Sequence, residues 1–457
     1  MSMNRRELLE TMGSGFGLLG LADLLQATGQ RSGRLPTARA KHVIYLFLAG
    51  GPSQVDTFDP KPTLTRYNGQ PLPTGSVRTE RKTGNLLASP FEFKRCGQSG
   101  IEVSEIFPLL GERIDDICVI RSMHTERPNH EPSLLRMNCG FPLPGRPSMG
   151  SWITYGLGTE NENLPAFMVL SARPPVVGPP LWASGFLPAT YQGTHIRMDQ
   201  TDPEKLIPHI RGDKTSPLEQ RSQLDLLEKH NRLHLKRVGG DPELEGRIQA
   251  MEVAFRMQTE AVDAFDVGQE SVAVRERYGP GHFARGCLMA RRLVERGVRM
   301  VQVYFTDESN SQSWDDHDDI LNHRKLAFRA DRPIAALLGD LKASGLLEET
   351  VVLVGGEFGR TPVTEVSART LAHNGRDHNH HGFSVLMAGG GVKGGVTYGA
   401  TDDFGFKAVE NPVDVPDLHA TILHLLGLDH ERLTYRYSGR DFRLTDVSGR
   451  VIQEILA

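Results

Sequence analysis

The strongest constraint on the fold of this chain is a series of short, continuous apolar runs. They are rich in Val, Ile and Leu and do not alternate apolar with polar residues. Such runs are typical of strands that are covered on both faces, as in a parallel sheet. We therefore expect strands at residues 42–50, 117–123, 166–171, 298–305, 350–356 and 383–390.

Helical patterns alternate with these apolar runs. They occupy residues 133–140, 287–297, 332–347 and 416–428, and the last three end near a glycine, as helices commonly do. Strands that alternate with helices predict an α/β fold. We expect a mostly parallel sheet sandwiched by helices.

Two regions depart from this pattern. Residues 216–296 contain long, charged, amphipathic stretches, which predict a helical insertion that lies on the sheet. Residues 1–40 carry paired arginines, Arg5 and Arg6, before a moderately apolar, glycine-rich stretch. This is typical of a twin-arginine export leader, and the alternative is an amphipathic first helix. The α/β domain is then expected to span 41–457, in a periplasmic or otherwise extracytoplasmic location.

The composition excludes several classes of function. A net charge of −4 gives no electrostatic basis for binding nucleic acid. No apolar run reaches the roughly 18 residues that a membrane span needs. The four cysteines lie far apart with no Cys-x-x-Cys spacing, which argues against a zinc knuckle and favours buried free thiols.

Metal-type ligands follow two of the predicted strands. In "SWDDHDDI" (313–320), Asp315 and His317 are two residues apart, so an extended backbone points both side chains the same way. A carboxylate and an imidazole together suit Zn²⁺, Mn²⁺ or a similar ion. In "VVLVGGEFGRTP" (351–362), Glu357 is placed as a metal ligand or a base, and Arg360 as a binder of an anionic group. A surface pair between Glu357 and Arg360 is the alternative.

A third group of ligands comes just before a predicted strand, in "GRDHNHHGFSVLMAGGG" (375–391). His378 is the metal candidate of this segment, whereas His380 and His381 could be ligands, proton donors or solvated residues. Sites in open α/β sheets form beyond the carboxyl ends of the strands. We therefore expect the three segments to converge.

Two earlier segments offer further candidates. "GGPSQVDTFDPKP" (50–62) contains Asp56 and Lys61, although a loop with Asx turns is nearly as good an interpretation. "HTERPNHEPSLLRMNCG" (124–140) places Asn129 and His130 at the start of a helix, where free backbone N–H groups attract anions. Asn129, Lys61 and Arg376 are the predicted substrate-binding residues.

Several motifs together resemble the bacterial domain of unknown function 1501 family, and the resemblance covers nearly the whole chain. It rests on the twin-arginine start and on "LAGGPSQVDTFDPKP", "GRPSMGSWITYGLG", "CLMARRLVERGVRMVQVYF", "WDDH", "GGEFGRTP", "AGGGVKGGVTYG" and "DLHATILHLLGL". That family is placed in the alkaline phosphatase and sulfatase superfamily. The resemblance thus implies an alkaline-phosphatase-like fold and a metal-dependent hydrolysis.

The resemblance also implies roles for individual residues. His130 stands where the superfamily has its Ser, Thr or Cys nucleophile, so it could be a metal ligand, a nucleophile or a general acid or base. Asp315, His317 and His378 resemble one retained metal site. The second site is altered: its histidine is replaced by Phe358, and Asp56 could compensate for an acidic residue that is missing after the first strand.

Two hypotheses follow. The first is an exported hydrolase of phosphate or sulfate esters that uses a divalent ion, either zinc, manganese or calcium, and acts on an anionic ester or a sulfated polysaccharide. Its metal ligands are Asp315, His317, His378, Glu357 and Asp56, and its catalytic residues are His130, Glu357 and Arg360. The second is a catalytically degenerate member of the superfamily that binds a sulfated or phosphorylated polysaccharide or a protein partner.

Overall fold

The computed structural model describes residues 38–73, 75, 79–200, 216–238, 262–366 and 374–457, with Leu35, Leu206 and part of 244–257. Almost all of the predicted export leader lies outside the described residues. Within them, no helix is both long enough and apolar enough to cross a membrane.

The core of the protein is a nine-stranded sheet with the strand order β13-β5-β12-β9-β1-β8-β6-β7, in which β16 also pairs with β5. All six strands predicted from the apolar runs are confirmed as members of it. Neighbouring strands are parallel except at β12, which runs antiparallel to both β5 and β9. The members of the sheet are β1 (His42–Phe47), β5 (Ile117–His124), β6 (Phe167–Ser171), β7 (Thr194–Arg197), β8 (Met300–Tyr304), β9 (Thr350–Gly355), β12 (Phe383–Ala388), β13 (Val396–Tyr398) and β16 (Val413–Asp414).

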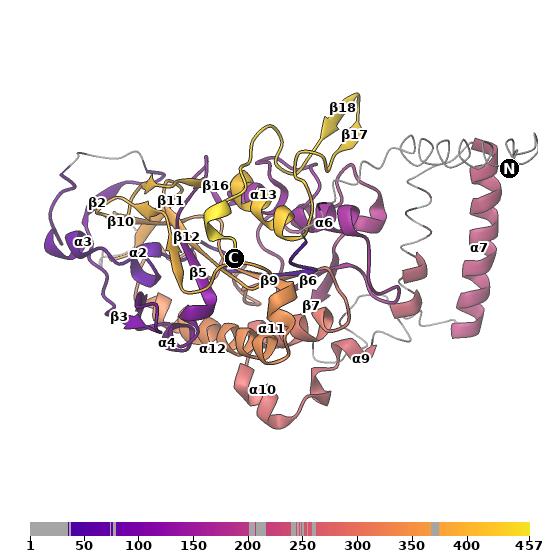
Figure 1. The fold of residues 1–457 in the computed structure, drawn as a ribbon, viewed down its shortest axis with the longest axis horizontal. Helices are drawn as coiled ribbons and strands as arrows, with labels where there is room; N and C mark the ends of the chain where they lie inside the picture. Colours follow the sequence, from indigo (N-terminus) through magenta and orange to yellow (C-terminus); the bar gives the residue numbers. More distant parts are fainter. Residues whose placement is uncertain are drawn as a thin grey trace, which may run out of the picture.

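Helices cover both faces of this sheet, as the apolar runs required. On one face lie α4 (Pro108–Gly111), α11 (His282–Val294) and α12 (Asn322–Ala343). On the other lie α5 (His130–Cys139), α6 (Met149–Leu157) and α13 (Val415–Leu425), and Figure 1 shows the sheet between the two layers. In β1, Ile44 and Leu46 pack into one core and Tyr45 and Phe47 into the other, as the two-residue period of a strand dictates. The predicted fold class is confirmed.

The predicted insertion contains helices of two kinds. α11 packs against β8 and belongs to the core of the sheet. In contrast, α7 (Pro217–Val238) stands apart from the sheet in Figure 1 and leaves Leu218 and Leu226 largely exposed. Between them lie α9 (Val262–Phe265) and α10 (Val272–Tyr278).

A small second sheet with the order β11-β10-β2 completes the part of the fold that matters for function. It contains β2 (Thr83–Leu86), β10 (Gly359–Glu365) and β11 (Arg376–Asn379), and its ladder sets Arg360 opposite His378. The remaining elements are α2 (Gln54–Thr57), α3 (Pro62–Arg66), β3 (Phe93–Cys96), β4 (Ile101–Ser104), β14 (Ala400–Thr401), β15 (Ala408–Glu410), β17 (Tyr435–Tyr437) and β18 (Arg440–Phe442). All four cysteines are free thiols.

Candidate functional site

Segments that are distant in the sequence meet beyond the carboxyl ends of the parallel strands. The loops after β1, β5, β8 and β9 all reach this edge of the sheet. Because β12 runs in the opposite direction, its amino end lies at the same edge, and this brings in β11 just before it. Parallel strands therefore supply residues that follow them, whereas β12 supplies residues that precede it.

One carboxylate oxygen lies at the centre of this site. Asp315 Oδ1 is 2.8 Å from His317 Nε2, 3.1 Å from His378 Nε2 and 3.2 Å from His130 Nε2. The structure thus brings together the three segments that the sequence predicted to converge, and adds His130 from the start of α5.

The far side of each of these imidazole rings is held by an acceptor. His130 Nδ1 lies 2.6 Å from Glu357 Oε1, and His378 Nδ1 lies 2.6 Å from Glu80 Oε2. His317 Nδ1 hydrogen-bonds to Glu365. In metal sites, a carboxylate or carbonyl on one ring nitrogen fixes the ring and its tautomer, so that the other nitrogen can bind the ion. Each of the three histidines has this arrangement. We call His130, His317 and His378, together with the Asp315 that they surround, the imidazole cluster.

The electrostatics of the cluster favour a bound cation. Burial lowers the pKa of His130, but its hydrogen bonds with Asp315 and Glu357 outweigh this effect and raise the pKa to about 9. Burial raises the pKa of Asp315, but Arg360 and the three imidazoles lower it far below its usual range. The carboxylates around His130 thus stabilise a positive charge on a half-buried imidazole, and they would stabilise a divalent ion at the same place.

The donor set fits a divalent metal ion. The Nε2 atoms of His130 and His317 are buried, and each faces the Asp315 carboxylate, at 3.2 and 2.8 Å. Ligand atoms of His130, Asp315 and His378 all lie within 4.8 Å of one another. Imidazole nitrogens and a carboxylate oxygen are the ligands that zinc takes in catalytic sites. Asp315 Oδ1 faces these three imidazoles and Arg360 at once, so one oxygen does not fully satisfy all of them, and a bound ion would complete their contacts.

Glycine at position 50 allows this packing. Gly50 has a φ of +114°, and a Cβ there would lie 2.3 Å from the backbone nitrogen of Asp315. Its own N–H donates to both carboxylate oxygens of Glu357, at 3.0 and 3.2 Å. The "GG" after β1 therefore lets the backbone approach Asp315 and orients Glu357, which in turn orients His130.

Arg360 occupies a different position from the one expected of an anion-binding residue. Its side chain is fully buried, and its Nη2 donates to Asp315 Oδ1 at 2.7 Å. The same Nη2 also donates to the carbonyl of Gly50, and Nε donates to the carbonyl of Gly51. In this structure, Arg360 holds the loop after β1 against Asp315, and no part of its guanidinium is open to solvent.

Asp56 and Arg376 form a buried ion pair with each other, outside the imidazole cluster. Arg376 Nε donates to Asp56 Oδ2 at 2.7 Å, and Nη2 donates to Oδ1 at 3.1 Å. Both side chains have 0% exposure. The predicted metal ligand and the predicted substrate-binding residue thus satisfy one another.

The other predicted site residues are placed as follows. Lys61 Nζ lies 3.0 Å from Asp59 Oδ1 and donates to the carbonyl of Thr401. Asn129 is at the edge of the cluster, where its Nδ2 donates to Glu80 at 2.9 Å. The rings of His380 and His381 contact each other outside the imidazole cluster, with their centroids 3.8 Å apart and their planes tilted by 37°.

Sequence reasoning missed two carboxylates of the site. Glu365 lies at the end of β10, and Glu80 in the segment before β2. Neither residue follows a strand of the main sheet, and neither has a histidine near it in the sequence. Only the pairing of β10 with β11 and β2 brings them close, and no local pattern encodes that pairing.

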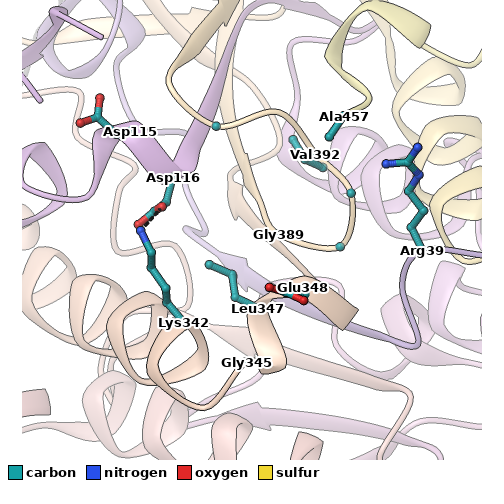
Figure 2. Close-up of a pocket in the computed structure, with 13 residues that line it drawn as sticks. Arg39, Asp115, Asp116, Lys342, Gly345, Leu347, Glu348, Gly389, Val392 and Ala457 are labelled. Carbon is teal, nitrogen blue, oxygen red and sulfur yellow. Dashed lines mark hydrogen bonds and ion pairs between the residues drawn. The ribbon is translucent and has the colours of Figure 1, made fainter. Parts of the chain in front are cut away.

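A second hollow opens at the opposite edge of the sheet and is chemically different. Figure 2 shows it lined by Arg39, Asp116, Lys342 and the glycines at 389–391, with the ion pair of Lys342 and Asp116 at 2.6 Å. It contains no histidine and none of the predicted site residues. The candidate centre is therefore the imidazole cluster.

Fold and site together define an α/β protein with a candidate metal centre at the carboxyl edge of a mostly parallel sheet. The chain belongs to the family described as protein of unknown function (DUF1501), whose profile matches residues 40–456. This match confirms the resemblance seen in the sequence motifs. Among curated proteins, none matches the chain.

Several solved structures are similar to this chain at low identity. The PsFucS1 sulfatase from Pseudoalteromonas sp. is 11% identical with a TM-score of 0.36, over 90% of this chain and 71% of that one. Ps i-CgsB in complex with k-i-k-neocarrahexaose is 10% identical with a TM-score of 0.36, over 86% and 73%. The phosphonate monoester hydrolase SpPMH from Silicibacter pomeroyi is 11% identical with a TM-score of 0.35, over 77% and 71%.

Proposed function

We propose that this protein is an exported, metal-dependent hydrolase of phosphate or sulfate esters. One observation carries the proposal: three imidazoles direct a ring nitrogen at Asp315, and each is held from behind by a carboxylate. An arrangement that fixes three rings in this way fits the binding of an ion better than it fits a surface network. Export rests on the paired Arg5 and Arg6.

The ligands that we propose are Asp315 and His378, completed by His130 and His317. A divalent ion held there would act as a Lewis acid on an ester oxygen. Glu357 fixes the ring of His130 and holds a proton at its Nδ1. The Phe358 ring packs 4.9 Å from that of His130 and 4.5 Å from that of His378, so it keeps water from one side of the cluster.

The role of His130 separates two versions of this mechanism. If His130 is a ligand, His130→Ala lowers the metal content. If it transfers a proton or attacks the ester, the variant retains the metal and loses turnover. The short distance from its Nε2 to Asp315 favours the first version.

The direct test is the metal content of the purified protein, together with turnover of an aryl phosphate and an aryl sulfate with and without EDTA. We expect bound metal and EDTA-sensitive turnover of at least one ester. His378→Ala should lose most of the metal, whereas His381→Ala, three residues further on and outside the cluster, should retain it. Metal-free wild-type protein that still hydrolyses either ester would refute the proposal.

A second candidate function is that of a binding protein for a sulfated or phosphorylated polysaccharide. It is favoured by the full burial of Arg360 and Arg376, which leaves neither free to contact a substrate, and by a histidine where the superfamily has its nucleophile. Stoichiometric metal with no turnover of either ester would support this function over hydrolysis.

A further inference from the structure

The cations that the sequence offered for anion binding are all engaged elsewhere. Arg360 and Arg376 have 0% side-chain exposure, and Lys61 has 11% and is paired with Asp59. A centre that processes an anionic ester needs a cationic donor that solvent and substrate can reach. The described residues next to the imidazole cluster include one such group, on the segment before β2.

That group is Arg81. Its backbone N–H donates to Asp377 Oδ2 at 2.7 Å, one residue before His378. Its Nη1 donates to Glu365 Oε1 at 3.1 Å, the same carboxylate that holds His317. The two contacts fix both the backbone and the guanidinium of Arg81 beside the cluster.

The Arg81 side chain differs from the buried arginines because it is 46% exposed. Its Nε and Nη2 donate to no other residue in the part of the chain that the structure describes. Two donors on one edge of a planar guanidinium match two oxygens of a phosphate or sulfate group. The preceding Glu80 contacts both His378 and Asn129, which ties this segment to the cluster at a second point.

We propose that Arg81 forms the subsite that binds the tetrahedral oxyanion group of the substrate. The guanidinium retains its contact with Glu365 through Nη1 and offers Nε and Nη2 to the anion. Without a cation, the carboxylates of Asp315, Glu357 and Glu365 repel an anion, so binding at Arg81 requires the metal as well. The identity of the bound group as part of an ester rests on the proposed function.

The test is the affinity of the full-length, metal-loaded protein for inorganic phosphate and for sulfate, measured by isothermal titration calorimetry. Arg81→Gln should weaken binding of the preferred anion by tenfold or more with unchanged metal content, because charge-assisted hydrogen bonds are lost. Arg81→Lys retains the charge but lacks the two parallel N–H donors of the guanidinium, so its affinity should lie between those of the wild type and Arg81→Gln. Lys82→Gln, the matched loss of charge on the next residue, should bind as the wild type does.

The outcomes separate this inference from the proposed function. Wild-type affinity in Arg81→Gln, or no binding of either anion by the metal-loaded wild type, would overturn the subsite. Arg127 is an exposed arginine in the loop before α5. If Arg127→Gln, and not Arg81→Gln, weakened anion binding, the subsite would lie at Arg127 and the inference would also be overturned. Anion binding that depends on Arg81 in a protein without turnover would uphold the subsite and refute hydrolysis.

Discussion

Disruption of the buried pair of Asp56 and Arg376 should destabilise the fold and leave the metal in place. Arg376→Met removes the partner of the Asp56 carboxylate, which has 0% exposure. It also removes the hydrogen bonds that Arg376 donates to the carbonyls of Thr361 and Leu87. Removing one partner of a buried pair costs roughly 3–5 kcal/mol, because the remaining charge is desolvated and unpaired. Asp56→Leu should cost a similar amount.

The double variant Asp56→Leu/Arg376→Met makes this reasoning quantitative. Replacement of both charges with apolar groups is often close to neutral. The double variant should therefore cost less than the two single costs added together, and this difference, the coupling free energy, should be roughly 3 kcal/mol or more.

The assay is urea-induced unfolding of the four proteins, with metal analysis of each one under native conditions. We expect equal metal content throughout. Single variants within about 1 kcal/mol of the wild type would refute the pairing argument. Loss of metal from Asp56→Leu at unchanged stability would instead make Asp56 a ligand.

Two further predictions concern the loop after β1. Gly50→Ala should lower both stability and metal content, because its φ of +114° is strained for alanine and the new Cβ would lie 2.3 Å from the backbone of Asp315. Thermal melting and metal analysis check this expectation. The control for positive φ is Gly69→Ala, where the new Cβ has no neighbour within 4 Å. The Nε2 atom of His323 accepts a hydrogen bond from the Ser53 N–H, and burial lowers the pKa of His323 to about 3. Between this pKa and the ordinary value of 6.5, the imidazole of His323 is therefore protonated in the unfolded chain and neutral in the folded one. The free energy of unfolding should therefore fall as the pH drops below 6.5, by up to about 1.4 kcal/mol per unit from this group, and an unchanged pH slope in His323→Gln would contradict that assignment.

The sequence was most informative where the physics is local. Apolar runs located the strands of the main sheet, because burial on both faces leaves a direct mark on composition. The position of a ligand beside the end of a strand was also readable, which is why Asp315, after one strand, and His378, just before another, could be named. Neither observation required knowledge of which strands pair.

The sequence was least informative about long-range partners of charged residues. Arg360 follows a glycine at a strand tip and looks like an anion binder, but its neighbours Gly50 and Asp315 lie in the loops after β1 and β8. Arg81 has no local signal at all, because its importance comes from Glu365 and Asp377 across the small sheet. Burial of a charge is decided by tertiary pairing, which spacing alone does not contain.

The reversed direction of β12 bears on how relatives of this chain could diversify. β11 reaches this edge ahead of a strand, whereas the loops after β1, β8 and β9 follow one. Substitutions in β11 would change the surroundings of the candidate site without altering any crossover between parallel strands. Variation in that short strand is thus a simple route to a new binding specificity on an unaltered scaffold.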